Sequence, residues 1–459
     1  MMNSADDNHS AGNDSAQNAL VDWFRASTQY INAHRGKTFV VSLPGDALTS
    51  EHLNKLIADL TLLHTLGVKL VIVHGARPQI DAALAAAQLP NDYFAGVRIT
   101  TPESIDTIAA VVGAQSIRLE ALFSAGTQSA SSAPLASTRG EALMVSRGNF
   151  LTAMPIGIRD GIDFHHTGRV RRVNAKAIDA RLNDNALVLQ STLAYSLTGE
   201  VFNLTADEVA GQIAIALQAD KLITLIPQDG ITSDAGELIA ALNPTDAAVL
   251  SARYSQSDID VQRQLGSTLD ACVNACTAGV KRAHLIGYQS NGALIRELFT
   301  RAGAGSLISD DSLDSLRAAS IDDVAAILAL IAPLEADGTL VVRSRERLET
   351  EIENFKVIEL EGAIIACAAL YRTTPSFGEI ACIAIHPSYR KLGLGARLLQ
   401  ALNEEAKTLG MTQTFVLTTS AAHWFIDQGF VEGALSDLPE QRQALYNLQR
   451  KSKIFLRAI

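Results

Sequence analysis

The sequence predicts an α/β protein of two domains, a three-layer αβα domain followed by a smaller α+β domain. Its 459 residues exceed what one hydrophobic core usually serves. Short apolar runs alternate with helical repeats over most of the chain, which is typical of helices packed on a sheet. The segment 301–315, RAGAGSLISDDSLDS, is rich in Gly, Ser and Asp, and such a composition is typical of a domain boundary.

The helices and strands expected in the first domain, residues 19–305, alternate along the chain. The run 68–73, VKLVIV, is apolar throughout, which is typical of a buried parallel strand. Helices are predicted at 20–33, 51–66, 206–218, 293–299 and from residue 79, and strands at 38–43, 68–73, 186–189, 221–226 and 283–286.

A linker is predicted at residues 306–315, and a second domain at 316–459. In that domain the spacing of apolar residues predicts helices at 322–330 and 394–409, and strands at 355–359, 363–370, 379–385 and 414–418.

The composition is that of an ordinary globular chain, with 47% hydrophobic and 19% charged residues. Because the formal net charge is −11, we expect no general affinity for nucleic acid or for an anionic membrane. The apolar stretch 66–73 is too short to span a bilayer. Residues 1–18 are polar, without a basic start or an apolar run, so we expect a disordered tail and no signal peptide.

The four cysteines are too few for a disulfide framework. Cys272 and Cys276 lie four apart in a helical pattern, and no His or Cys stands near them at metal-ligand spacing. We expect buried thiols in a reducing cytoplasm, and no metal site.

The most informative segment is GEIACIAIHPSYRKLGLGARLLQAL, residues 378–402. In it the loop 390–396, RKLGLGA, follows an apolar strand and opens a helix. Glycines let backbone N–H groups approach a phosphate, and the helix N-terminus favours an anion. A Gly-rich loop alone is also compatible with a simple turn.

The whole arrangement, an apolar strand, a proline, Arg-x-x-Gly-x-Gly and an apolar helix, resembles the acetyl-CoA loop of the GNAT acetyltransferases. The resemblance implies that the loop binds the pyrophosphate of acetyl-CoA, a co-substrate rather than a tightly bound cofactor. It also implies that the preceding strand pairs with the pantetheine arm and that its amides polarise the thioester carbonyl. The residues implied are Cys382, Ile383, Ala384, Ile385, Arg390, Lys391, Leu392, Gly393, Leu394, Gly395 and Ala396.

Attack of an amine on a thioester requires a neutral amine, and a nearby carboxylate can accept its proton. Glu379 stands at the start of the predicted strand, where it matches the general base of the N-acetylglutamate synthase family; otherwise it is a solvated strand-end glutamate. Many GNAT enzymes protonate the leaving thiolate with a tyrosine, but that position holds Phe425. Thr418 is the best-placed substitute by resemblance, although a thiol with a pKa near ~8.5 leaves readily without a strong acid.

Two segments of the second domain, LVVRSRERLE and YNLQRKSK, resemble substrate-binding segments of the same family. The resemblance implies that Arg343, Arg450 and Ser452 bind L-glutamate, and the planar fork of an arginine matches a carboxylate. Neighbouring Arg345, Lys451 and Lys453 are expected on the surface. Charge alone does not separate glutamate from aspartate.

The first domain resembles the amino acid kinase fold, and N-acetylglutamate kinase in particular. The matching segments are INAHRGKTFVVSLPG (31–45), VIVHGARPQID (71–81) and AHLIGYQSNGALIRELFTRAGAGSLI (283–308). The kinase has a lysine where this chain has Ser42, two glycines where it has Pro44-Gly45, and His-Gly-Gly-Gly-Pro where residues 74–78 read HGARP. Because phosphoryl transfer depends on cations and open phosphate loops, we expect that kinase activity has been lost.

The same resemblance implies a regulatory site for L-arginine between the N-terminal helix and the last strand–helix unit. Its residues are Tyr30, His284, Glu297 and Gly303, with the carboxylate of Glu297 suited to a guanidinium. The alternatives are a core histidine and a solvated glutamate. Family members of this length form rings, so a homo-oligomer, by resemblance a hexamer, is expected.

The sequence therefore predicts an enzyme that transfers acetyl from acetyl-CoA to the α-amine of L-glutamate by direct attack in a ternary complex. This is the first step of arginine biosynthesis, with feedback inhibition by L-arginine. Three alternatives stay open: a bifunctional synthase-kinase, an arginine-binding regulatory protein with an inactive transferase domain, and a transferase for another amino acid.

Overall fold

The computed structural model divides into two compact units, Met1–Asp311 and Ser312–Ile459, and each is considered by itself. It describes residues 30–125, 143–233, 235–300, 303–309, 314–360, 363–389, 393–446 and 452–459, together with Val21, Trp23, Arg25, Ser27 and Thr28. The tail predicted at residues 1–18 lies outside the described residues.

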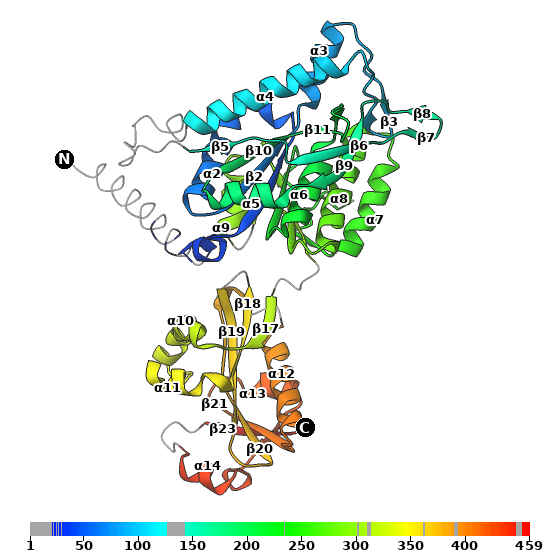
Figure 1. Cartoon of the computed structure of the whole chain (residues 1–459). Helices are drawn as coiled ribbons and strands as arrows, with labels where there is room; N and C mark the ends of the chain where they lie inside the picture. Colours follow the sequence, from blue (N-terminus) through cyan, green and yellow to red (C-terminus); the bar gives the residue numbers. More distant parts are fainter. Residues whose placement is uncertain are drawn as a thin grey trace, which may run out of the picture. The chain divides into compact units, whose positions relative to one another are not determined.

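The first unit is built around an eight-stranded sheet (Figure 1). Its pairs are parallel except that β16 runs antiparallel to β15. In spatial order the strands are β14 (Ala241–Leu242), β16 (Gly305–Ile308), β15 (Arg282–Gly287), β13 (Lys221–Ile226), β1 (Thr38–Leu43), β2 (Lys69–His74), β10 (Leu187–Ser191) and β5 (Val145–Ser146).

Helices cover both faces of this sheet, because successive strand residues point to opposite sides. Along β1, Phe39 and Val41 pack with α2 and α9, whereas Val40 packs with α6 and α8. The predicted three-layer αβα fold is therefore confirmed. The helices are α2 (Leu53–Thr65), α3 (Arg77–Ala86), α4 (Ile105–Ala125), α5 (Ala175–Asn183), α6 (Ala206–Leu217), α7 (Pro244–Ser255), α8 (Asp260–Thr277) and α9 (Ala293–Phe299).

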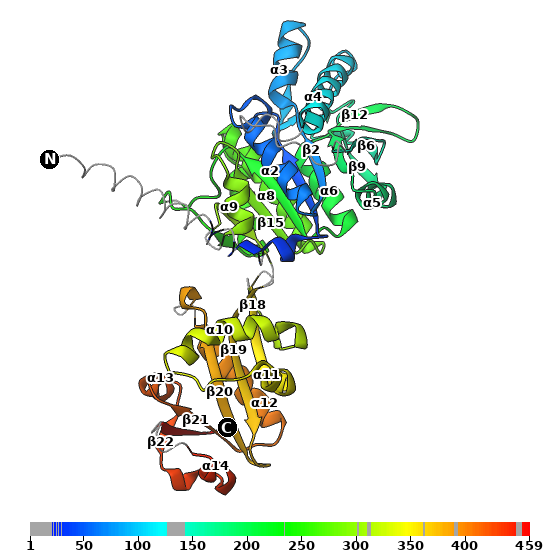
Figure 2. The ribbon, with the colours of Figure 1, turned by 90° about the vertical axis from the view of Figure 1, so that its left-hand side faces the viewer.

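A second, four-stranded sheet lies beside α4 and α6 in this unit, and it was not predicted (Figure 2). Its strands are short or, like β9 (GRVRRV), rich in arginine, so they lack a continuous apolar run. In spatial order they are β12 (Val201–Asn203), β11 (Leu193–Tyr195), β6 (Leu151–Pro155) and β9 (Gly168–Val173); two small hairpins are β3 (Tyr93–Phe94) with β4 (Val97–Arg98) and β7 (Ile158–Arg159) with β8 (Ile162–Asp163).

Helix α4 is the one helix among the described residues that is long and apolar enough to cross a membrane by length and composition. Its buried positions, Ile105, Ile108, Val112, Ser116, Leu119 and Phe123, recur every three or four residues. This one-sided burial is typical of a helix packed on a domain core.

The second unit has a seven-stranded sheet that is antiparallel except where β20 pairs with β21. Its strands are, in spatial order, β17 (Asp314–Ala318), β18 (Phe355–Leu360), β19 (Ala363–Arg372), β20 (Phe377–Ile385), β21 (Gln413–Thr418), β23 (Lys453–Ala458) and β22 (Val431–Gly433). Helices α10 (Val324–Ala336) and α11 (Arg345–Glu351) pack on one face, and α12 (Leu394–Thr408) with α13 (Ala422–Asp427) on the other (Figure 1). Helix α14 (Glu440–Ala444) follows β22.

The segment 306–315, predicted as a linker, differs in the structure. Residues up to Ile308 belong to β16, which is fully paired to β15, and β17 begins at Asp314. Glycine, serine and aspartate over residues 301–315 made this stretch resemble a loop. Gly305, at the start of β16, is needed because a Cβ there would lie 2.3 Å from the carbonyl oxygen of Leu285. Close packing of backbones, rather than a flexible turn, explains the glycine.

Candidate active site

The sheet of the second unit opens at a defined point. Strand β20 pairs with β21 only over residues 377–379, whereas the next residues of β20 pair with β19 alone. Strand β21 turns its other edge to β23 along its whole length. The segment 380–385, which includes the four predicted strand residues Cys382 to Ile385, therefore has an unpaired backbone edge facing the opening.

A β-bulge changes which face the residues of β20 present. Ala368 of β19 stands opposite two residues of β20, Cys382 and Ile383, and Cys382 has a left-handed φ of 56°. Ile380 packs with the α12 cluster, but Cys382, two residues later, packs with α10. A regular strand would place both on one face, so the bulge redirects the backbone amides beside the opening.

Helix α12 begins next to this edge. Gly393 precedes it with a φ of 71°, a conformation that side chains other than glycine rarely adopt. A Cβ at Gly395 would lie 3.1 Å from both Ile385 and Trp424, so this glycine lets the helix approach β20 closely. Leu394 is buried in the core and Ala396 is half-buried. The predicted loop residues Arg390, Lys391 and Leu392 lie outside the described residues.

Glu379 lies in the last residue pair before β20 and β21 separate. Its two carboxylate oxygens accept hydrogen bonds from Arg442 of α14, at 2.6 Å from Nε and 2.9 Å from Nη2. Only 14% of the Glu379 side chain and 22% of the Arg442 side chain are exposed. This is a bidentate, partly buried ion pair. Glu379 is therefore not the solvated strand-end residue of the alternative interpretation.

Arg343 lies on the same face of the sheet as Glu379. Tyr371 stands directly opposite Glu379 in the β19–β20 register, so the two side chains project from one face. The backbone N–H of Arg343 donates to Glu335 Oε1 of α10 at 2.9 Å, and Tyr371 and Cys382 both pack with the α10 cluster. The structure thus brings Arg343, Glu379 and Cys382 to one side of the opening.

Thr418 and Ser452 lie at the far side of the opening. Thr418, the last residue of β21, pairs with Lys453 of β23, and Ser452 is the next residue along the chain. The hydroxyl of Thr418 accepts hydrogen bonds from the backbone N–H groups of Ser420 and Ala421, at 3.3 and 3.0 Å. Tyr446 donates to the carbonyl oxygen of Ser452 at 2.6 Å. Arg450 lies outside the described residues.

Sequence reasoning missed Tyr371 and Arg442. The strand containing Tyr371 was predicted to end at residue 370, two residues before the end of β19, so the register of Tyr371 with Glu379 did not appear. Arg442 is 63 residues from Glu379 and no sequence pattern links the two. Phe425 is core: it is 6% exposed and packs against Phe430.

In the first unit, three of the four residues predicted for arginine lie together. His284 Nδ1 is 2.7 Å from Glu297 Oε1, and Glu297 Oε2 accepts from the amides of Ala304 and Gly305. A Cβ at Gly303, whose φ is 65°, would lie 2.7 Å from Glu297 Oε2. Burial acts to raise the pKa of Glu297, but the contacts with His284 and the two amides outweigh it and the pKa is lowered.

Two further residues border this cluster. Tyr30 is buried in the same core cluster as Leu298 and Phe299 of α9. Lys221 Nζ lies 3.3 Å from His284 Nε2 and is only 5% exposed. The cluster is thus buried, so Glu297 is not the solvated glutamate considered above.

In the structure Ser42 belongs to a cluster of hydroxyl groups around the carboxylate of Asp207. Ser42 and Thr268 donate to Asp207, at 2.9 and 2.6 Å. Burial raises the pKa of Asp207. Among the hydrogen bonds and ion pairs of the described residues, no lysine or arginine contacts this carboxylate.

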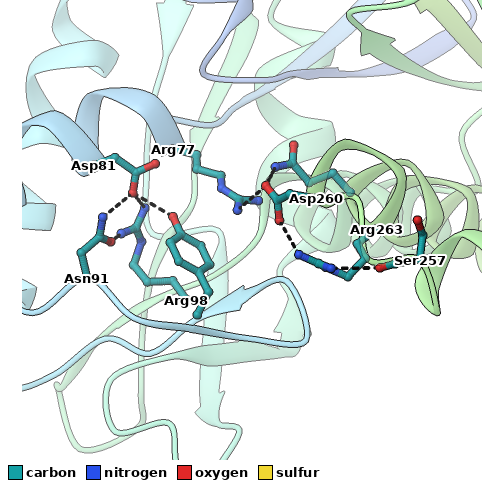
Figure 3. A network of polar contacts seen from close by, with 9 residues as sticks. Arg77, Asp81, Asn91, Arg98, Ser257, Asp260 and Arg263 are labelled. Carbon is teal, nitrogen blue, oxygen red and sulfur yellow. Dashed lines mark hydrogen bonds and ion pairs between the residues drawn. The ribbon is translucent and has the colours of Figure 1, made fainter.

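Arg77, the first residue of α3, belongs to an ionic network that is shown in Figure 3. Arg77 pairs with Asp260 of α8 at 3.2 Å and lies over the ring of Tyr93, 4.4 Å from its centroid. Asp260 also contacts Arg263. On the other side of Tyr93, Arg98 pairs with Asp81 at 2.7 Å. The side chain of Arg77 therefore links the start of α3 to α8.

No group of three or more His, Cys, Asp or Glu side chains suited to a metal ion occurs within the part of the chain that the structure describes. All four cysteines are buried and free.

Comparisons with known proteins cover both units. The model of the amino acid kinase family matches residues 37–287, and that of the acetyltransferase (GNAT) domain matches residues 351–432. An amino-acid acetyltransferase of Pseudomonas putida (strain GB-1) is 46% identical over 440 residues, which are 96% of this chain and 99% of that protein.

Solved structures of related proteins also match both units of the chain. N-acetylglutamate synthase from Neisseria gonorrhoeae, complexed with coenzyme A and L-arginine, is 34% identical, with a TM-score of 0.81 over 96% of this chain and 99% of that one. A second structure of that synthase, complexed with coenzyme A and N-acetyl-glutamate, has a TM-score of 0.59 at 34% identity, over 95% of this chain and 99% of that one. The chain therefore belongs to the amino-acid acetyltransferase family, in which an amino acid kinase-like domain is joined to a GNAT acetyltransferase domain.

Proposed function

We propose that this acetyltransferase transfers acetyl from acetyl-CoA to the α-amine of L-glutamate by direct attack in a ternary complex. The observation that carries the proposal is the position of Glu379, a partly buried carboxylate at the point where β20 and β21 separate. The related Neisseria synthase, solved with coenzyme A and N-acetyl-glutamate, supports the choice of substrate.

Acetyl-CoA would bind along the unpaired edge of β20. Its pantetheine amides would pair with residues 382–385 as an added strand does, and the bulge at Cys382 would direct an amide to the thioester carbonyl. The pyrophosphate would lie at the start of α12, where Gly393, Leu394, Gly395 and Ala396 follow the predicted loop residues 390–392.

Glu379 would accept the proton of the amine, directly or through a water. In the structure both of its oxygens are bound by Arg442, so the ion pair has to open before Glu379 can accept a proton. A carboxylate of the substrate is a suitable competing partner for Arg442, since an arginine binds either carboxylate in the same bidentate way. Binding of the dicarboxylate would thereby free the base.

Thr418 would donate a hydrogen bond to the departing thiolate, which leaves without a strong acid because the pKa of the thiol is near ~8.5. The oxygen of Thr418 already accepts two backbone N–H groups, and its own proton remains to be donated. The substrate carboxylates would be held by Arg343, Arg450 and Ser452. Ser452 is the residue before the one that pairs with Thr418, which supports a single site containing both.

The first unit would bind L-arginine as a feedback inhibitor at Tyr30, His284, Glu297 and Gly303, in a cytoplasmic homo-oligomer of the arginine biosynthetic pathway. The buried Glu297 carboxylate is a suitable partner for a guanidinium, and the Neisseria relative was solved with L-arginine. The two distinct sites would be coupled through two states of the protein.

Kinase activity is not expected from this domain. Asp207 is bound by the hydroxyls of Ser42 and Thr268 instead of by cations, and a γ-phosphoryl group requires positive charge in the transition state. Incubation with ATP and N-acetylglutamate should yield no phosphorylated product. Its formation would support the bifunctional alternative.

The proposal is tested by incubating the full-length protein with acetyl-CoA and single amino acids, and identifying products by mass spectrometry. N-acetylglutamate as the main product, over the acetylated forms of aspartate, glutamine and ornithine, is the expected result. Acetylation of another amino acid would replace the substrate assignment, and no product with any amino acid would favour a regulatory protein with an inactive transferase domain.

A further inference from the structure

Tyr371 and Glu351 form a polar contact next to Arg343 that none of the roles above uses. The hydroxyl of Tyr371 donates to Glu351 Oε2 at 2.7 Å, and Arg347 Nε donates to Glu351 Oε1 at 2.8 Å. Tyr371 belongs to β19 and Glu351 ends α11, so this contact joins the sheet to the helix that follows Arg343.

The hydrogen bonds in this group have a defined direction. Burial, and then the hydrogen bond to Glu351, raises the pKa of Tyr371, so the phenol keeps its proton. Burial acts to raise the pKa of Glu351, but the bonds from Tyr371 and Arg347 outweigh it and the pKa is lowered. The guanidinium of Arg343 lies beside the Tyr371 hydroxyl. Because the single proton of Tyr371 is given to Glu351, the phenol oxygen is free to accept from Arg343 and cannot donate to it.

One buried donor of the Arg343 side chain has no acceptor within the described part of the chain. The Nη1 of Arg343 donates to the carbonyl oxygen of Val341 at 3.1 Å, and its backbone N–H donates to Glu335 Oε1 at 2.9 Å. Its Nε atom is buried, and no acceptor for it exists among the described residues. Buried donors are nearly always satisfied in folded proteins, so this atom indicates a place for an oxygen of a ligand.

The location of that place follows from the strand register. Tyr371 is directly opposite Glu379, and Tyr371 packs with the α10 cluster, on the face where Arg343 contacts Glu335 of α10. The unsatisfied donor therefore lies on the face of the sheet that carries the proposed base.

We propose that Tyr371, anchored by Glu351, is a positioning residue that holds Arg343 in place for a carboxylate of the amino-acid substrate. This inference rests on the proposed function and deepens it, since it assigns a residue to recognition of the amino acid and none to acetyl-CoA. The Tyr371 ring packs edge-on against Phe355, with centroids 6.5 Å apart, so removing the hydroxyl alone preserves its packing.

The test compares Tyr371→Phe with wild type in a CoA-release assay. The KM for glutamate should rise about tenfold, the cost of losing one hydrogen bond to a charged group. The KM for acetyl-CoA should stay within about twofold, and kcat should change less than the KM for glutamate. Glu351→Gln should also raise the KM for glutamate.

Glu349→Gln is the matched control. It lies on the same helix, α11, and breaks the same kind of pair four residues apart, with Arg345 at 2.7 Å, but on the exposed side. All kinetic constants of this variant should equal those of wild type.

A double variant tests whether Tyr371 acts on glutamate binding through Arg343. If Tyr371 acts by placing Arg343, then adding Tyr371→Phe to Arg343→Gln should cause no further rise in the KM for glutamate. A full additional tenfold loss in the double variant would overturn the proposal. So would an unchanged KM for glutamate in Tyr371→Phe, above all with a lowered melting temperature, because that result assigns the tyrosine to the fold alone.

Failure of the proposed function is recognised separately. Calorimetric titration of glutamate into the CoA-bound protein gives the dissociation constant of glutamate. This constant can be compared between wild type and Tyr371→Phe without turnover. A wild-type protein that binds glutamate but releases no CoA would contradict the transfer reaction, and the ratio of the two dissociation constants would still decide the role of Tyr371. If wild type binds no glutamate, both proposals are wrong.

Discussion

At the scale of single residues, Glu379 illustrates what a sequence can and cannot predict. Its place at the start of a strand before the Gly-rich loop is visible in the sequence. Its partner Arg442 is not, because the two meet only after α14 folds back towards β20. The left-handed Cys382 in the bulge is equally invisible, since a cysteine carries no compositional sign of a positive φ.

Replacing the carboxyl by an amide tests the role of Glu379. Glu379→Gln keeps the shape but cannot accept the amine proton, so kcat should fall by about 10²–10⁴. The KM for acetyl-CoA should hardly change, because Glu379 lies outside the edge and loop proposed to bind it. Steady-state release of CoA measures both constants, and unchanged turnover would remove Glu379 from the mechanism.

At the scale of elements, apolar runs located the central strands well: β1, β13 and α9 have the bounds predicted from the sequence. The pattern failed where pairing, rather than hydrophobicity, defines a strand. Arginine-rich β9 pairs with β6, and β16 completes the large sheet from a segment predicted to be a linker. Such strands are recognisable only once their neighbours exist.

The β15–α9 unit carries a prediction about regulation. Glu297→Gln keeps the size of the side chain but removes its charge, and breaking a buried charge pair costs about 2–5 kcal/mol. The concentration of arginine that halves activity should therefore rise about 30-fold or more. The measurement is a titration of CoA release with arginine, and an unchanged midpoint would show that the inhibitor binds elsewhere.

The contact between Arg317 of β17 and Asp323, the residue before α10, carries a prediction about pH. The hydrogen bonds from Arg317, opposed by burial, lower the pKa of Asp323 to about 2 from 3.8. The stabilisation is therefore present above about pH 4 and is lost as the pH falls through 2. Arg317→Gln should lower the free energy of unfolding by about 1–3 kcal/mol at pH 7, with a smaller difference at pH 3.

The measurement is urea unfolding followed by the fluorescence of Trp424, in a Trp23→Phe background so that only the second unit is observed. Arg345→Gln is the control, because its pair with Glu349 is exposed, 72% and 39%, and such pairs contribute about 0–1 kcal/mol. A difference for Arg317→Gln that does not shrink at low pH would contradict the assigned ion pair.

At the scale of the whole molecule, the two units divide the chemistry. The second holds the opened sheet and Glu379, whereas the first keeps a kinase-like framework with a carboxylate, Asp207, enclosed by hydroxyls. The sequence predicted both folds, because resemblance runs along nearly the whole chain. It could not predict how side chains from distant elements complete a site, as Tyr371 and Arg442 do.

The central claim is an acetyltransferase of glutamate that is governed by arginine at its kinase-like domain. The most direct test is release of CoA by the full-length protein from acetyl-CoA and L-glutamate, with and without millimolar L-arginine. We predict release that requires glutamate and is suppressed by arginine. Glutamate-dependent release that ignores arginine would contradict the regulatory half of the account, and absence of glutamate-dependent release would contradict the account as a whole.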